Sequence, residues 1–156
     1  MPNWCHNSLY IRGNEKQIEK FKQTAKREST EDSPESDLSF ENFIPTPEHL
    51  LEISEKQPSD MGWYTWRNNT WGTKWDVEAD LVCDDEEMLE YSFDSAWAPP
   101  LQFVLRVSKI LKKLSFMIRY EEPGMGFSGL FRARKGFIIE DQYIEDGDFW
   151  NEELDK

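Results

Sequence analysis

The sequence predicts an α+β fold in which an antiparallel sheet carries two main helices on one face. Three observations indicate it: alternating apolar and polar residues near the start, two segments with helical spacing of apolar residues, and strand-like segments after each. Hydrophobic residues make up 38% and aromatic residues 14% of 156 residues, which favours a ring-rich core over disorder. We expect residues 1–156 to form a single domain.

The first strand is expected at about Cys5 to Arg12, and Gly13 and Asn14 end it. A helix follows at about 15–27, and its apolar face comprises Ile18, Phe21 and Ala25. An insert is expected at about 28–75. Its first part, 28–41, is acidic and Ser-rich and predicts a loop, and its last part is rich in Trp.

The second half predicts a hairpin from residues 76–83 and 90–94, with an acidic turn between them. Pro99 and Pro100 suit the first turn of a second helix. Strands are expected at about 116–121, 127–134 and 137–143, before an acidic tail at about 144–156.

The order of these elements matches the ferredoxin-like βαββαβ plan, followed by two extra strands. In that plan both helices pack on the same face of the sheet. Their shared core is expected to contain Ile18, Phe21, Val104, Leu105 and Leu111.

A Trp-rich segment at 62–76 carries four Trp residues within thirteen positions, and the Asn68, Asn69, Thr70 run predicts a loop between the two Trp pairs. A buried Trp needs an acceptor for its indole N–H. In the structural interpretation, Trp rings from several element starts close one end of the sheet and are mostly buried. In the alternative, part of the cluster is exposed and receives a ligand. The candidate binding residues are Trp4, Trp71, Lys74, Trp75, Asp76 and Trp97.

The net charge is -13, which disfavours nonspecific binding of the whole molecule to nucleic acid or to anionic membranes. Basic residues nevertheless outnumber acidic ones in 1–27 and in 101–135. If the two helices lie side by side, their outer faces form one basic patch. Its members are Lys16, Lys20, Arg106, Lys109 and Lys113.

No motif in the sequence predicts catalysis, a metal site or a cofactor. Gly124, Gly126 and Gly129 match G-x-G-x-x-G, but a strand follows them where a dinucleotide site needs a helix. Cys5 and His6 are adjacent and point to opposite strand faces, and neither pairs with Cys83 or His49 at chelate spacing. An enzyme is therefore the least supported class. The chain lacks an 18-residue apolar run and a signal-peptide pattern, so we expect a cytoplasmic protein.

Three motifs carry a family resemblance: NWC at 3–5, WGTKWD at 71–76 and AWAPP at 96–100. Together they resemble the YubB ferredoxin-like domain family, a set of plasmid- and phage-borne proteins of unknown function. The resemblance implies the ferredoxin-like fold and a mobile-element origin. It implies no activity.

Two function classes remain. The first is a non-enzymatic protein-interaction module with an acidic surface, for example an acidic decoy for a nucleic-acid-binding host factor. The alternative is a nucleic-acid-binding accessory protein that uses the basic helix face or exposed Trp side chains. The exposure of the Trp rings separates the classes, because base stacking needs exposed rings and a decoy does not.

Overall fold

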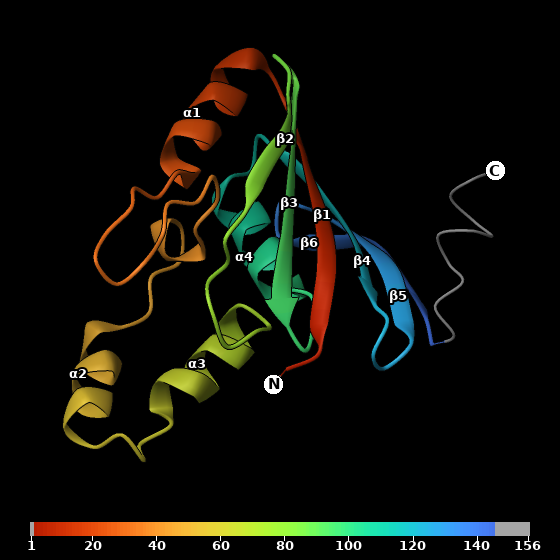
Figure 1. Ribbon diagram of the computed structural model, residues 1–156. Helices are drawn as coiled ribbons and strands as arrows, with labels where there is room; N and C mark the ends of the chain where they lie inside the picture. Colours follow the sequence, from red (N-terminus) through yellow and green to blue (C-terminus); the bar gives the residue numbers. More distant parts are fainter. Residues whose placement is uncertain (1, 146–156) are drawn as a thin grey trace.

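The computed structural model describes residues 2–145, and one sheet organises them (Figure 1). Six strands form it: β1 (Trp4–Arg12), β2 (Asp80–Asp84), β3 (Met88–Ala96), β4 (Ser115–Glu122), β5 (Phe127–Arg134) and β6 (Phe137–Ile144). The helices are α1 (Glu15–Ala25), the 3-10 helix η1 (Phe40–Asn42), α2 (Glu48–Lys56), α3 (Gly62–Thr70) and α4 (Leu101–Ile110). None of these helices is long and apolar enough to cross a membrane.

The sheet has the order β2-β3-β1-β4-β5-β6, and every neighbouring pair is antiparallel. The first four positions are the ferredoxin-like order, and β5 and β6 extend it at one edge. The helices α1 and α4 lie on the same face (Figure 1). The predicted fold class, with its two extra strands, is therefore confirmed.

The core lies between this face and the helices. Alternate residues of β1, among them Leu9 and Ile11, point into it because successive strand side chains face opposite ways. The predicted core residues Ile18, Phe21 and Val104 are buried. Leu105 and Leu111 pack only at the margin, because α4 turns its Phe103, Val104 and Val107 side inward.

The insert is more ordered than the sequence predicted. Within 28–41, Leu38 and Phe40 are fully buried, so this stretch is not merely a surface loop. Phe40 stacks on Phe103 of α4 at 4.2 Å between ring centroids, and Phe43 stacks on Phe21 of α1 at 4.7 Å. The η1 segment thus ties the two main helices together.

The Trp-rich segment also differs from the prediction. Asn68, Asn69 and Thr70 belong to α3, and Trp71 is the residue that ends this helix. The expected acidic tail begins within β6 at Ile144, and residues 146–156 lie outside the described residues.

Candidate functional site

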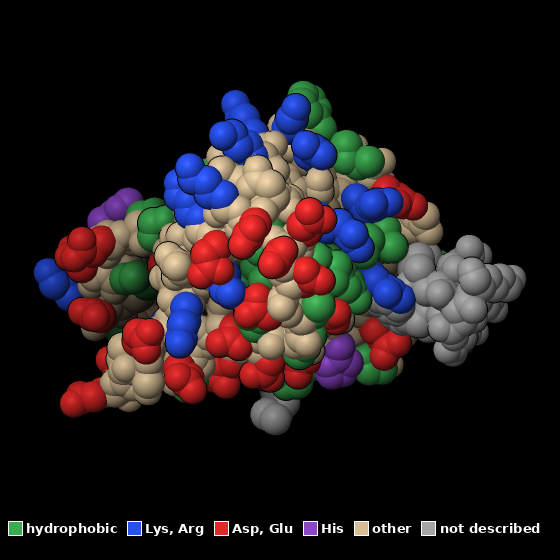
Figure 2. Space-filling view, turned by 90° about the horizontal axis from the view of Figure 1, so that it is seen from above, with side chains coloured by type: hydrophobic (Ala, Val, Ile, Leu, Met, Phe, Trp, Pro, Cys, Tyr) green, Lys and Arg blue, Asp and Glu red, His purple; other side chains and the backbone are tan. Residues whose placement is uncertain are grey.

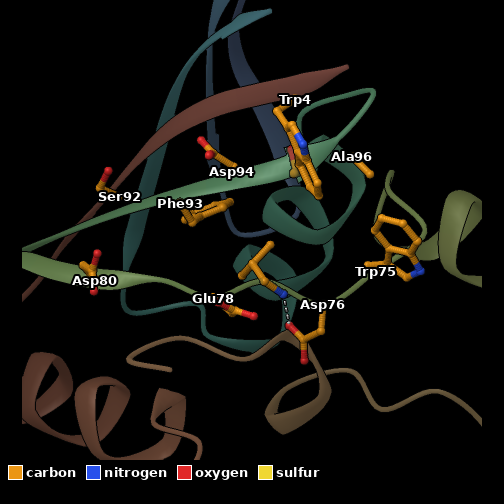
Figure 3. A pocket seen from close by; sticks show the side chains of 11 residues that line it. Trp4, Trp75, Asp76, Glu78, Asp80, Ser92, Phe93, Asp94 and Ala96 are labelled. Carbon is orange, nitrogen blue, oxygen red and sulfur yellow. Dashed lines mark hydrogen bonds between the residues drawn. The ribbon is translucent and has the colours of Figure 1, made fainter. Parts of the chain in front are cut away.

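A groove opens where β2 and β3 separate. Their pairing ends at Asp80 and Ser92, whereas β3 continues to Ala96. The chain before β2 is held away from the sheet by the insert: the backbone N–H of Ala79 donates to Ser36 Oγ at 2.8 Å, and that of Asp37 donates to the Ala79 carbonyl at 3.0 Å. The resulting cavity has a volume of about 600 Å³ (Figure 3).

Two neighbouring Trp rings line this groove. Trp4 begins β1 and is 41% exposed, and Trp75 precedes β2 and is 40% exposed. Their ring centroids are 6.2 Å apart, with a tilt of 35° between the planes. The Lys74 Nζ atom lies 4.1 Å from the Trp75 ring centroid, which is the geometry of a cation–π contact.

Three exposed carboxylates also line the groove, beside apolar and hydroxyl side chains. Glu78, Asp80 and Asp94 line it and are exposed (Figure 3). Asp94 pairs with His6 across the strands at 2.6 Å. Within residues 2–145, no three His, Cys, Asp or Glu side chains converge in a way that suits a metal ion. The groove therefore offers dispersed negative charge next to aromatic rings.

Asp76 also borders the groove, but its carboxylate is committed to the fold. Oδ1 accepts from the backbone N–H groups of Phe40 at 2.7 Å and Val77 at 2.8 Å. Oδ2 accepts from Ser39 Oγ at 2.6 Å and from the Glu41 N–H at 3.2 Å. Asp76 thus anchors the start of η1, so its prediction as a ligand-binding residue is not supported by its surroundings.

Trp71 is likewise a core residue. Its ring is fully buried, and its indole N–H donates to the Ile44 carbonyl at 3.0 Å. Phe40 and Trp66 pack edge-on against it at 5.6 and 5.8 Å. The expectation of a mostly buried Trp cluster is therefore right for Trp71 and wrong for Trp4, Trp75 and Trp97.

Trp97 lies beside the groove in an unusual backbone conformation. It follows Ala96, which pairs with Trp4, and its N–H donates to the Asn3 carbonyl at 2.8 Å. Its φ is +70°, and 48% of the residue is exposed. A bulky residue in the left-handed region is a genuine outlier that costs about 1 to 2 kcal/mol. The chain thus holds a third half-exposed ring at this end of the sheet despite backbone strain.

This strain gives a testable difference between two truncations. Trp97→Gly and Trp97→Ala remove the same ring, but only glycine adopts a φ of +70° without a Cβ clash. We expect the glycine variant to be more stable than the alanine variant by about 1 kcal/mol. Urea unfolding of the two variants measures this difference in stability. Equal unfolding midpoints for the two variants would show that the backbone at Trp97 is unstrained.

The residues predicted to form one basic patch are not among those that line the groove. All five predicted members, Lys16, Lys20, Arg106, Lys109 and Lys113, are exposed, and within residues 2–145 none of them forms an ion pair. Figure 2 shows basic side chains gathered along one edge of this view and acidic ones across its middle. The Lys113 backbone adjoins Gly13, just past the end of β1 that is remote from Trp4. A nine-residue strand places these ends about 27 Å apart.

The two cysteines differ in environment. Cys5 is buried on the helix side of β1, while neighbouring His6 is exposed on the other side, as their adjacency predicted. Burial raises the pKa of the Cys5 thiol to about 12, so it stays protonated at neutral pH. Cys83 is half-buried.

Sequence reasoning missed the three exposed carboxylates of the groove. The alternation in β3 would have placed Ser92 and Asp94 on the helix-free face, opposite Tyr91 and Phe93. No comparable signal marked Glu78 and Asp80, because they join the groove only where β2 leaves β3.

Comparisons with known proteins agree with this architecture. The structure of the protein Api92 from Yersinia pseudotuberculosis has a TM-score of 0.70 to this chain at 11% sequence identity. The likeness covers 92% of this chain and 98% of that one, and it shows a shared fold. A comparison with curated proteins gave no match.

A family model described as the ferredoxin-like domain in Api92-like proteins matches residues 70–156, which is more than half of the chain. This match overturns the resemblance to the YubB family, although two of its three motifs, WGTKWD and AWAPP, lie in the matched region. The mobile-element origin that the resemblance implied loses its support. The chain belongs to the family of Api92-like proteins with a ferredoxin-like domain.

Proposed function

We propose that the chain is a non-enzymatic protein-interaction module that binds a basic segment of a partner protein in the groove that Trp4 and Trp75 line. The observation that carries the proposal is the pairing of two half-exposed Trp rings with exposed carboxylates in one cavity of about 600 Å³. Aromatic rings beside carboxylates suit a Lys or Arg side chain. The apolar stem lies on a ring while the charged end reaches an acid.

The chain itself illustrates the contact. Lys74 already places its ammonium 4.1 Å from the centroid of the Trp75 ring. Such contacts contribute about 0.5 to 1 kcal/mol at exposed sites and about 2 kcal/mol when water is excluded. Two rings and three carboxylates therefore support binding of a short segment with more than one basic residue.

The surroundings of the rings argue against base stacking. Half-exposed Trp rings meet the first requirement for binding single-stranded nucleic acid, and a decoy does not require them. The second requirement is a positively charged groove along the strand. Glu78, Asp80 and Asp94 would repel phosphates here, and Lys113 lies near the opposite end of β1.

A basic partner also fits the charge of the whole chain. At a net charge of -13, long-range attraction favours encounters with basic proteins. Nucleic-acid-binding proteins carry basic surfaces for phosphates. Their basic segments are therefore one class of partner that the groove suits, as an acidic decoy would require.

The test is a titration of the chain with a short Lys- and Arg-rich peptide at low salt, in which calorimetry measures the binding. We expect binding that Trp4→Ala and Trp75→Ala each weaken by at least about tenfold, since buried aromatic anchors dominate interfaces. Tyr64→Ala is the matched control, because Tyr64 is 39% exposed on α3 and lies outside the groove. It should bind like the wild type.

Charge variants complete the design. Glu78→Gln with Asp80→Asn should weaken peptide binding, whereas Glu86→Gln with Glu87→Gln, at the distant β2–β3 turn, should have a small effect. Affinity should fall with added salt, because exposed charges are screened beyond about 10 Å at 0.1 M. Salt-independent binding, absence of binding, or tighter binding of single-stranded DNA would contradict the proposal.

A further inference from the structure

Two arginines lie on the helix-free face of the sheet, at the end remote from Trp4. In the strand register, Ser115 of β4 lies between Arg12 of β1 and Arg134 of β5, and the Arg134 guanidinium donates to Ser115 Oγ at 3.2 Å. Neighbouring strands are about 4.8 Å apart, so the Cα atoms of the two arginines lie about 10 Å apart. Both side chains are exposed, and neither forms an ion pair within residues 2–145.

Lysines on two turns extend this positive charge past the end of the sheet. The turn between β5 and β6 holds Lys135, and the backbone N–H of Gly136 ties it to Ser108 Oγ of α4 at 3.1 Å. The turn that follows α4 holds Lys112 and Lys113. All three lysines are exposed, and none forms an ion pair in the part of the chain that the structure describes. The sheet-end basic cluster therefore comprises Arg12, Lys112, Lys113, Arg134 and Lys135.

A cavity of about 240 Å³ opens beside this cluster. Tyr10, Arg12, Met117 and Arg132 are among the residues that line it. The Tyr10 and Met117 side chains are half-buried, so the cavity offers a partly accessible ring next to two guanidinium groups. Arg132 lies 3.6 Å from Glu140, and an exposed ion pair of this kind contributes little to stability. The cavity thus combines a surface for a planar ring with donors for an anion.

We propose that the sheet-end basic cluster binds single-stranded nucleic acid, with phosphates on Arg12, Arg134 and Lys135 and one base on the Tyr10 ring. The argument for this occupant is charge complementarity combined with the ring. Lys and Arg side chains neutralise phosphates, and a basic surface with an aromatic ring is how proteins bind single strands without sequence preference. A duplex keeps its bases stacked inside, where Tyr10 does not reach them.

Acidic residues limit the path of the strand on the β3 side. Glu90 pairs with Tyr10 across β1 and β3, and the β2–β3 turn brings Glu86 and Glu87 next to Arg12. These carboxylates repel phosphates, so the strand leaves Arg12 toward β5 and does not cross β3.

This proposal does not rest on the proposed function of the groove, which lies at the other end of β1. The net charge of -13 opposes the approach of any polyanion. We therefore expect the oligonucleotide to bind more weakly than the basic peptide binds in the groove.

Fluorescence anisotropy of a labelled oligothymidylate of about twelve nucleotides, titrated with the full chain at low salt, tests the proposal. Three phosphate contacts predict a slope of about -2 for log affinity against log salt concentration, at roughly 0.7 per phosphate. Arg12→Gln should make this slope shallower by about 0.7. The matched control is Lys56→Gln, because Lys56 is exposed on α2 and has no ion pair within residues 2–145, and its slope should equal that of the wild type.

Two variants of Tyr10 test the base contact. Tyr10→Ala should weaken binding by at least about fivefold, whereas Tyr10→Phe keeps the ring and should bind like the wild type. Circular dichroism and urea unfolding confirm that each variant stays folded. Absence of binding at low salt, equal slopes for Arg12→Gln and Lys56→Gln, or tighter binding of double-stranded DNA would overturn the proposal. Binding that Trp75→Ala weakens and Arg12→Gln does not would place the oligonucleotide in the groove and overturn it as well.

Discussion

Replacing Trp71 with alanine should lower the free energy of unfolding by about 3 to 5 kcal/mol, the range for truncating a large buried aromatic. The ring is fully buried, and Phe40 and Trp66 pack against it edge-on. The variant also leaves the Ile44 carbonyl without its indole donor. Urea unfolding measures the loss.

Trp75→Ala provides the matched comparison. This ring is 40% exposed, so its truncation removes less buried surface and creates no enclosed cavity. We expect a loss below about 1.5 kcal/mol, well under the cavity-forming range. The structural interpretation of the sequence expected mostly buried rings at both positions, but only Trp71 is buried. Equal losses for the two variants would contradict this division between core and surface.

Asp76→Ala should destabilise the protein by about 3 to 5 kcal/mol, because it removes one partner of a largely buried polar network. Four donors point at this carboxylate, from Ser39, Phe40, Glu41 and Val77. The Arg27 guanidinium lies 3.5 Å from Oδ2. Each buried donor left unpaired costs about 1 to 3 kcal/mol.

Two further variants separate this role from a general effect of charge. Asp76→Asn keeps the shape but replaces one acceptor oxygen with a donor, so thermal unfolding should show an intermediate loss. Asp80→Asn removes a charge at an exposed position and should change stability by no more than about 0.5 kcal/mol. Wild-type stability of Asp76→Asn would mean that the network does not anchor η1.

The regular part of the fold could be predicted because its signals are local. In β1, buried Cys5, Leu9 and Ile11 alternate with outward residues, and this pattern is visible in the sequence. In α4, Pro99 and Pro100 precede a helix whose apolar residues recur at helical spacing. The order of such elements largely determines a ferredoxin-like topology.

The insert could not be predicted in the same way, because distant contacts determine its conformation. Phe40 is buried by Phe103 and Trp71, and the start of η1 depends on Asp76, which is 36 residues away. In α3, Asn68 is helical although its type favours turns, and its side chain donates to the Tyr64 carbonyl. The contacts of the surrounding structure outweigh the local turn propensity of this segment.

The candidate site was only partly predictable. The sequence singled out Trp4 and Trp75. Their exposure, however, depends on the last four residues of β3, which have no partner on β2. Just before β2, the chain at Ala79 forms hydrogen bonds with Ser36 and Asp37 and not with β3. Spacing in the sequence carries no information about such a separation of strands.

The most direct test of the groove as a binding site is an NMR titration that follows the indole N–H signals. A Lys- and Arg-rich peptide should shift the signals of Trp4 and Trp75, which line the groove, and leave that of buried Trp71 in place. Single Trp→Phe variants assign the three signals. If the Trp4 and Trp75 signals stay fixed while the peptide binds, the groove is not the site and the central proposal fails.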